Sequence, residues 1–176
     1  HLRQQFAVTA PELHHEWRFI AVTSQQCRRR CHRKRRRIGD LHYGLFASPE
    51  YLQQHAPITT IDDLAGHSAI LFVNGQGETR HWQWLDSSFN PKNLDYRLKI
   101  NSHFAAMDAV RMGLGIACLP KMMVEQDSSR SLIQILPQHP MRPTHVYALF
   151  AERRLMSPKV RSFIDLAVEL FAKNDY

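Results

Sequence analysis

One stretch of the sequence, Ile100 to Pro120, reads as a complete strand–helix–strand unit and restricts the fold more than any other. Its letters are INSHFAAMDAVRMGLGIACLP. Asn101 or Ser102 is a good N-cap directly after a strand that ends at Ile100. Gly113 and Gly115 end the helix, and the apolar run that follows is a buried strand closed by Pro120. Such units build parallel sheets, so the chain is predicted to be an α/β protein.

The helix of this unit is predicted to bury one face. Its apolar residues are spaced so that several can point to the same side of a helix. We expect the buried side to be supplied by Phe104, Ala105, Val110 and Met112.

Further elements on both sides of this unit follow the same local rules. Ser48 and Pro49 are typical of a helix start, and Thr60 is predicted to cap a second short helix that Gly66 ends. Strands are predicted at 42–47, 68–73, 81–85, 96–100, 131–137 and 144–152, with helices at 120–127 and 157–173. Before residue 38, the segments 6–11 and 17–24 could each be a short strand, although 17–24 could also be a helix end.

The last predicted helix carries a wide apolar stripe. Its members recur at helical spacing: Val160, Phe163, Ile164, Ala167, Val168 and Phe171. We expect this face to pack against its own lobe or against a second subunit.

The net charge of +7 comes from one short segment. Eight basic residues lie within ten positions: Arg28, Arg29, Arg30, Arg33, Lys34, Arg35, Arg36 and Arg37. Without them, 15 basic residues face 16 acidic ones, a net charge of about −1. Clustered like charges repel, so this run is expected to be exposed or disordered. Its arginines could bind phosphates without sequence preference, which makes a basic nucleic-acid-binding module an alternative function.

The sequence offers little catalytic or metal chemistry. It contains no G-x-S-x-G elbow, P-loop or G-x-G-x-x-G motif, and no H-E-x-x-H pair. Cys27 and Cys31 are followed by no matching pair of ligands, so neither a metal nor a cofactor is expected. The odd number of cysteines, with no apolar run of about 18 residues and no signal-peptide pattern, favours a cytoplasmic protein.

The turn at Asn101, Ser102 and His103 is the best candidate for a binding site. A helix that starts at the carboxyl end of a strand presents free N–H groups and a positive dipole end, and ligands of open α/β sheets bind at such places. Capping of the helix alone would also explain Asn101 and Ser102.

Several segments together resemble the effector-binding domain of LysR-type transcriptional regulators. They are YGLFASPEYLQQHAPITTIDDLAGHSAILF, LKINSHFAAMDAVRMGLGIACLPKMMV, SLIQILP and HVYALFAERRLMSPKVRSFIDLAVELF, and their order and spacing match over Ile38 to Phe171. The resemblance implies a fold like the type 2 periplasmic-binding proteins, with two α/β lobes and a small-molecule effector in the cleft. It also implies a non-enzymatic protein that forms homo-oligomers and regulates transcription. The start of the helix at Asn101 to His103 would suit an anionic effector.

The resemblance also implies effector-binding residues and a division of the chain. The cleft would include Asn101, Ser102 and His103, with Phe72, Gly115 and Ile116 as weaker candidates, and Thr9 on the first strand of the domain. The predicted division is an irregular basic segment at 1–37, the second lobe at 55–140, and crossover strands with the remainder of the first lobe at 38–54 and 141–176.

Two departures from the family pattern accompany the resemblance. The N-terminal helix-turn-helix and its linker helix do not occur in this sequence, so DNA contact is expected only through a part outside it. Residues 12–36 supply far less than the two strand–helix repeats that the family has there. We therefore also consider the hypothesis that the basic passage marks a deletion or a frameshift, which would make the chain a remnant. A solute-binding protein on the same fold is a further alternative.

Overall fold

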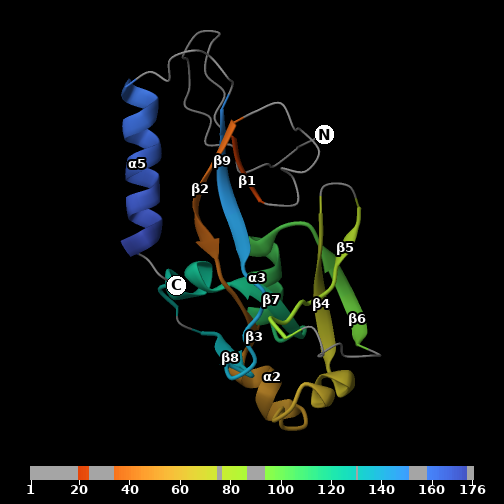
Figure 1. Ribbon diagram of the computed structural model, residues 1–176. Helices are drawn as coiled ribbons and strands as arrows, with labels where there is room; N and C mark the ends of the chain where they lie inside the picture. Colours follow the sequence, from red (N-terminus) through yellow and green to blue (C-terminus); the bar gives the residue numbers. More distant parts are fainter. Residues whose placement is uncertain are drawn as a thin grey trace. The chain divides into compact units, whose positions relative to one another are not determined.

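The computed structural model describes residues 20–23, 34–74, 77–86, 94–129, 131–150 and 158–173. The chain divides into two compact units (Figure 1). The first is formed by His1–Leu41 and Thr144–Tyr176, and the second by His42–Pro143. The second unit therefore begins at His42, earlier than the predicted lobe start at residue 55. In the part of the chain that the structure describes, no helix is both long and apolar enough to cross a membrane.

The first unit contains an antiparallel sheet and one long helix. The sheet order is β1–β9–β2, with β1 at Ile20–Thr23, β2 at Lys34–Leu41, β9 at Thr144–Phe150 and helix α5 at Pro158–Lys173. Ile164 of α5 is fully buried beside Ala148 of β9, and Ile38 and Val168 pack around them. The predicted apolar stripe therefore faces the sheet at Ile164 and Val168, whereas Phe163 is 53% exposed.

The end of the basic run forms a strand, which corrects the prediction of an irregular segment reaching residue 37. Lys34 to Arg37 pair with β9 as the first half of β2. Two of their side chains are ion-paired: Arg36 Nη1 lies 2.6 Å from Asp165 Oδ1, and Arg37 binds the carboxylate of Asp40. A strand at a sheet edge lets alternate side chains reach solvent, so charge clustering is compatible with pairing. Arg28, Arg29, Arg30 and Arg33 lie outside the described residues.

The second unit is built on a mixed sheet flanked by short helices. Its elements are β3 (Tyr43–Ala47), α2 (Pro49–Gln54), η1 (Asp62–Gly66), β4 (Ser68–Val73), β5 (Thr79–Arg80), β6 (Asp95–Ile100), α3 (His103–Arg111), β7 (Ile116–Pro120), α4 (Lys121–Glu125) and β8 (Ile133–Ile135). The order is β5–β4–β7–β3–β8, and β6 also pairs with β4. Strands β6 and β7 run parallel to β4, and β3 runs antiparallel to both β7 and β8.

The strand–helix–strand unit predicted from Ile100 to Pro120 is confirmed, but its buried face differs from the prediction. Val110 is fully buried as expected, whereas Phe104 is 55% and Met112 76% exposed, and Ala105 is exposed as well. The residues that α3 buries are Ala106, Met107, Ala109 and Val110. Each residue turns a helix by about 100°, so a small error in the starting residue rotates the predicted face away from the core.

Two other local predictions are wrong, and in both a nearby contact replaces the expected element. The segment 81–85 forms no strand: Trp82 and Trp84 are buried as irregular chain, and only Trp84 pairs, with Met141. Thr60 caps no helix. Instead, the Asp63 carboxylate accepts hydrogen bonds from the backbone N–H of Thr59 and of Thr60, at 2.9 and 2.7 Å, before the short helix η1.

Ser48 and Pro49 start α2 as predicted, and this helix holds a buried tyrosine that ties it to β4. The Ser48 Oγ accepts a hydrogen bond from the Tyr51 N–H. The Tyr51 hydroxyl accepts a hydrogen bond from the Ser68 N–H at 3.0 Å and lies 3.2 Å from His67 Nδ1. Because the hydroxyl oxygen already accepts from Ser68, its proton is available to His67.

Gly115 permits the close approach of β7 to β4. Its φ of +150° lies outside the range that side-chain-bearing residues favour, and a Cβ there would lie 2.4 Å from the Ser68 carbonyl oxygen. The turn between α3 and β7 therefore depends on a residue without a side chain.

We predict that Gly115→Ala lowers the free energy of unfolding by about 2 kcal/mol or more, since both the backbone and the Ser68 carbonyl must shift. Gly66→Ala is the matched control, because a Cβ at Gly66 meets nothing within 4 Å. Urea unfolding of the two variants measures the difference. Equal stability of the two variants would show that the close approach at Gly115 is unimportant.

Candidate effector-binding site

The candidate site lies where helix α3 begins. Ser102 is the N-cap, with extended backbone angles, and its Oγ accepts a hydrogen bond from the Ala105 N–H at 3.4 Å. Its carbonyl oxygen accepts a hydrogen bond from the Ala106 N–H at 2.9 Å. The first N–H groups of a helix have no acceptor within the helix, and the helix dipole places a partial positive charge there. The start of α3 is therefore suited to an acceptor or an anion.

The sheet places several further residues at this helix end. Phe72, near the end of β4, is the register partner of Ile100, the last residue of β6. Strand β3 runs the other way, so its first residue, Tyr43, pairs with Pro120 at the end of β7. The carboxyl ends of the parallel strands and the start of β3 therefore meet at one edge, where α3 starts.

Aromatic rings line one side of the sheet edge where α3 starts. The rings of Phe72 and His103 are stacked, with centroids 4.2 Å apart and planes 16° apart. The Tyr43 ring lies 6.3 Å from that of His103. We call the group of Tyr43, Phe72, Arg80, Asn101, Ser102 and His103 the α3 site. Within it, Asn101 is exposed, whereas Phe72, Ser102 and His103 are partly buried.

His103 is neutral at physiological pH. Burial, and then the positive charge of Arg80, lower its pKa to about 4. Arg80 belongs to the α3 site because β5 pairs with β4 in a register that places Arg80 opposite Phe72. The neutral imidazole can donate or accept one hydrogen bond without adding charge, so the positive potential of the α3 site comes from Arg80 and the helix end.

The structure brings together four of the predicted effector-binding residues and separates two others from them. Phe72, Asn101, Ser102 and His103 belong to the α3 site. Gly115 and Ile116 do not: they lie at the amino end of β7, where Ile116 pairs with Ala69, and Ile116 is fully buried.

Potential metal ligands do not cluster in the described part of the chain, in which Cys118 is the cysteine. No group of three or more His, Cys, Asp or Glu side chains lies close enough there to hold a metal ion. Burial raises the pKa of the Cys118 thiol to about 12, which leaves it protonated and unreactive. Cys27, Cys31 and Thr9 lie outside the described residues.

Comparison with known proteins identifies the family. The model of the LysR substrate binding domain matches residues 20–172. The chain belongs to the LysR family. It is 31% identical over 147 residues to the HTH-type transcriptional regulator CrgA of Neisseria meningitidis (strain 8013), covering 79% of this chain and 47% of CrgA. An uncharacterized HTH-type transcriptional regulator of Haemophilus influenzae is 30% identical over 129 residues, covering 71% of this chain and 44% of that protein.

Solved structures of LysR regulatory domains have the same fold. The regulatory domain of CrgA from Neisseria meningitidis matches with a TM-score of 0.66 and 26% identity, covering 81% of this chain and 71% of that one. The regulatory domain of an AphB variant from Vibrio vulnificus matches with a TM-score of 0.63 and 26% identity, covering 87% and 77%. The fold is therefore the type 2 periplasmic-binding-protein-like fold of LysR effector-binding domains. The chain spans about half the length of the curated relatives it matches.

Two residues of the α3 site, Tyr43 and Arg80, were not predicted from the sequence, for different reasons. Arg80 could have been found, because β5 follows β4 closely in the sequence and pairs with it in an antiparallel register that puts Arg80 opposite Phe72. Tyr43 could not, because its place depends on β3 running antiparallel to β7, and no local signal in the sequence sets that direction.

We predict that His103 makes the LysR domain less stable in acid. Its folded-state pKa of about 4 lies below the ordinary value of 6.5, so the unfolded chain binds a proton that the folded chain does not. Its contribution to the free energy of unfolding is complete above pH 6.5 and falls as the pH drops toward 4.

His103→Gln removes this dependence. We therefore expect the free energy of unfolding of the wild type, minus that of the variant, to be lower at pH 5 than at pH 7.5. Urea unfolding at the two pH values measures it. Because His67 and the carboxylates remain in both proteins, their contributions cancel. An unchanged difference would contradict the assigned pKa.

Proposed function

We propose that this LysR domain senses a small anionic metabolite at the α3 site. The proposal depends on one observation. The capped start of α3, the stacked rings of Phe72 and His103, and the positively charged Arg80 all belong to the same site. A carboxylate or similar oxyanion suits the helix N–H groups and Arg80, and the exposed Asn101 adds a side-chain amide. The stacked rings offer an apolar wall for the rest of the metabolite.

The neutrality of His103 fits an anion that also carries an apolar or hydrogen-bonding part. A protonated imidazole would simply add to the charge of Arg80. A neutral one instead presents a ring face and a single N–H, which can contact an uncharged part of the ligand. The α3 site therefore separates a charged end from a ring-lined wall, an arrangement expected for an organic acid.

The relatives support a proposal for the role of the whole protein. The similar proteins are named as HTH-type transcriptional regulators, among them a repressor of Pseudomonas aeruginosa and the activator AaeR of Escherichia coli. We infer that this chain is the sensing part of a non-enzymatic, cytoplasmic, homo-oligomeric regulator that binds DNA through a helix-turn-helix. Binding of the metabolite would favour one conformational state of the regulator over another.

The alternative function, a nucleic-acid-binding arm formed by the basic run, is less well supported than effector sensing. The evidence comes from the two arginines whose side chains the structure describes. Arg36 and Arg37 both engage carboxylates of the same unit, Asp165 and Asp40. A phosphate would have to compete with those partners for the two arginines.

The test is thermal unfolding of the chain, followed by tryptophan fluorescence, with a panel of small carboxylates and aromatic acids. Trp82 and Trp84 are 8% and 2% exposed in the second unit, so their emission reports on the unit that contains the α3 site. We expect one or more acids to raise the midpoint in a saturable way, because a ligand of the folded state stabilises it. The uncharged amide of the same acid should not.

Arg80→Gln should weaken binding of that acid by about tenfold, since it removes the positive charge that acts on His103. Arg97→Gln is the matched control, because Arg97 lies exposed on β6 and its loss changes the net charge by the same amount. If both variants bind equally well, or if no acid shifts the midpoint, the α3 site is not an anion sensor.

A further inference from the structure

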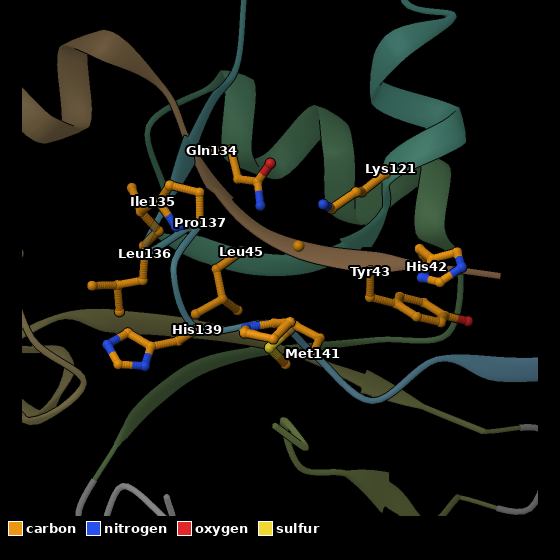
Figure 2. A pocket seen from close by; sticks show the side chains of 12 residues that line it. His42, Tyr43, Leu45, Lys121, Gln134, Ile135, Leu136, Pro137, His139 and Met141 are labelled. Atoms are coloured by element: carbon orange, nitrogen blue, oxygen red, sulfur yellow. The ribbon is translucent and has the colours of Figure 1, made fainter. Parts of the chain in front are cut away.

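A small cavity in the second unit adjoins the α3 site at Tyr43. Its volume is about 50 Å³, and its walls come from the start of β3, from β8 and the turn that follows it, and from Lys121. Figure 2 shows the side chains that line it. Such a volume accommodates a ligand of a few heavy atoms, because one water needs about 10–15 Å³ of comparable space.

The cavity exists beside a residue without a side chain. At Gly44 a Cβ would lie 3.1 Å from Nε2 and 3.2 Å from Cδ of Gln134, and 3.0 Å from Cε2 of Phe46. The Gln134 carboxamide therefore lies directly over the backbone of β3. In Figure 2 this carboxamide and the ammonium group of Lys121 both point toward that strand, from opposite sides of the view.

The polar groups at this cavity are mainly hydrogen-bond donors. Lys121 supplies three N–H groups and the Gln134 amide two, and neither side chain has a hydrogen-bond or ion-pair partner among the described residues. None of the residues that line the cavity is acidic. Both side chains are partly buried, and their donors border a cavity that no acidic residue lines, which favours a negatively charged occupant.

We propose that this cavity is a binding site for a small monovalent anion, either a halide or the carboxylate of an acid as small as formate. The anion accepts hydrogen bonds from Lys121 Nζ and from the amide of Gln134, whose carboxamide packs over Gly44. The small volume favours the smallest acids, whereas the α3 site is open at Asn101.

The cavity lies next to both the first and the last segment of the second unit. The chain enters the second unit at His42 and leaves it at Pro143. Two pairs of lining residues, His42–Tyr43 and Pro140–Met141, lie next to these two points. A bound anion therefore holds together the first and last segments of the second unit. Tyr43 also lies beside His103, so the two sites share one side chain.

The test follows the side-chain amide signals of Gln134 in a proton–nitrogen NMR spectrum of the full chain. The signals are assigned by their loss in Gln134→Glu. Sodium gluconate is replaced by sodium formate at constant ionic strength, and in a second arm by sodium chloride. We expect a saturable shift of the Gln134 signals and a rise of the thermal midpoint of about 3 °C at about ten times the dissociation constant.

Lys121→Met keeps most of the side-chain volume and removes the charge, and it should weaken formate binding at least tenfold. Gln134→Glu should abolish the midpoint shift, because its carboxylate pairs with Lys121 and repels the anion. Lys99→Met is the matched control on exposed β6 and should bind as the wild type does.

The two arms distinguish a halide from a carboxylate, and saturation in either supports the site. Gln134 signals that move with neither salt, or that move equally in Lys121→Met, would overturn it and leave the cavity as a water-filled space.

Discussion

The pairing of β4 between β6 and β7 is the constraint on which the second unit depends. Both neighbours run parallel to β4, so the chain must cross from the end of β6 to the start of β7, and α3 makes that crossing. The crossing fixes the start of α3 at the carboxyl ends of the strands. Ser102 caps the helix at one end, and Gly115 lets the chain approach β4 closely at the other. The place of the α3 site is therefore a consequence of sheet topology.

The chemistry of the α3 site follows from this placement. The helix end and Arg80 supply positive potential, while burial keeps His103 uncharged against Phe72. The second cavity has different chemistry: Lys121 and the Gln134 carboxamide line a small cavity beside Gly44. Under both proposals one unit combines a site for an organic acid with a small site for a simple anion, and Tyr43 borders both.

The sequence predicts those parts of the fold that local chemistry controls. The caps at Ser48 and Ser102 act within one helical turn, so both helix starts could be predicted. The separation of Gly115 and Ile116 from the start of α3 could not be predicted, because it depends on the directions of the paired strands. The burial of Trp84 likewise depends on the distant segment around Met141, which no periodic pattern reveals.

The most direct test of the account is a crystal structure of this domain with the carboxylate that stabilises it most. We predict that an oxygen of the carboxylate lies within hydrogen-bond distance of the first backbone N–H groups of α3, with its uncharged part against the ring of His103 or Phe72. A carboxylate bound elsewhere in the second unit, with the start of α3 contacted only by water, would contradict the central claim.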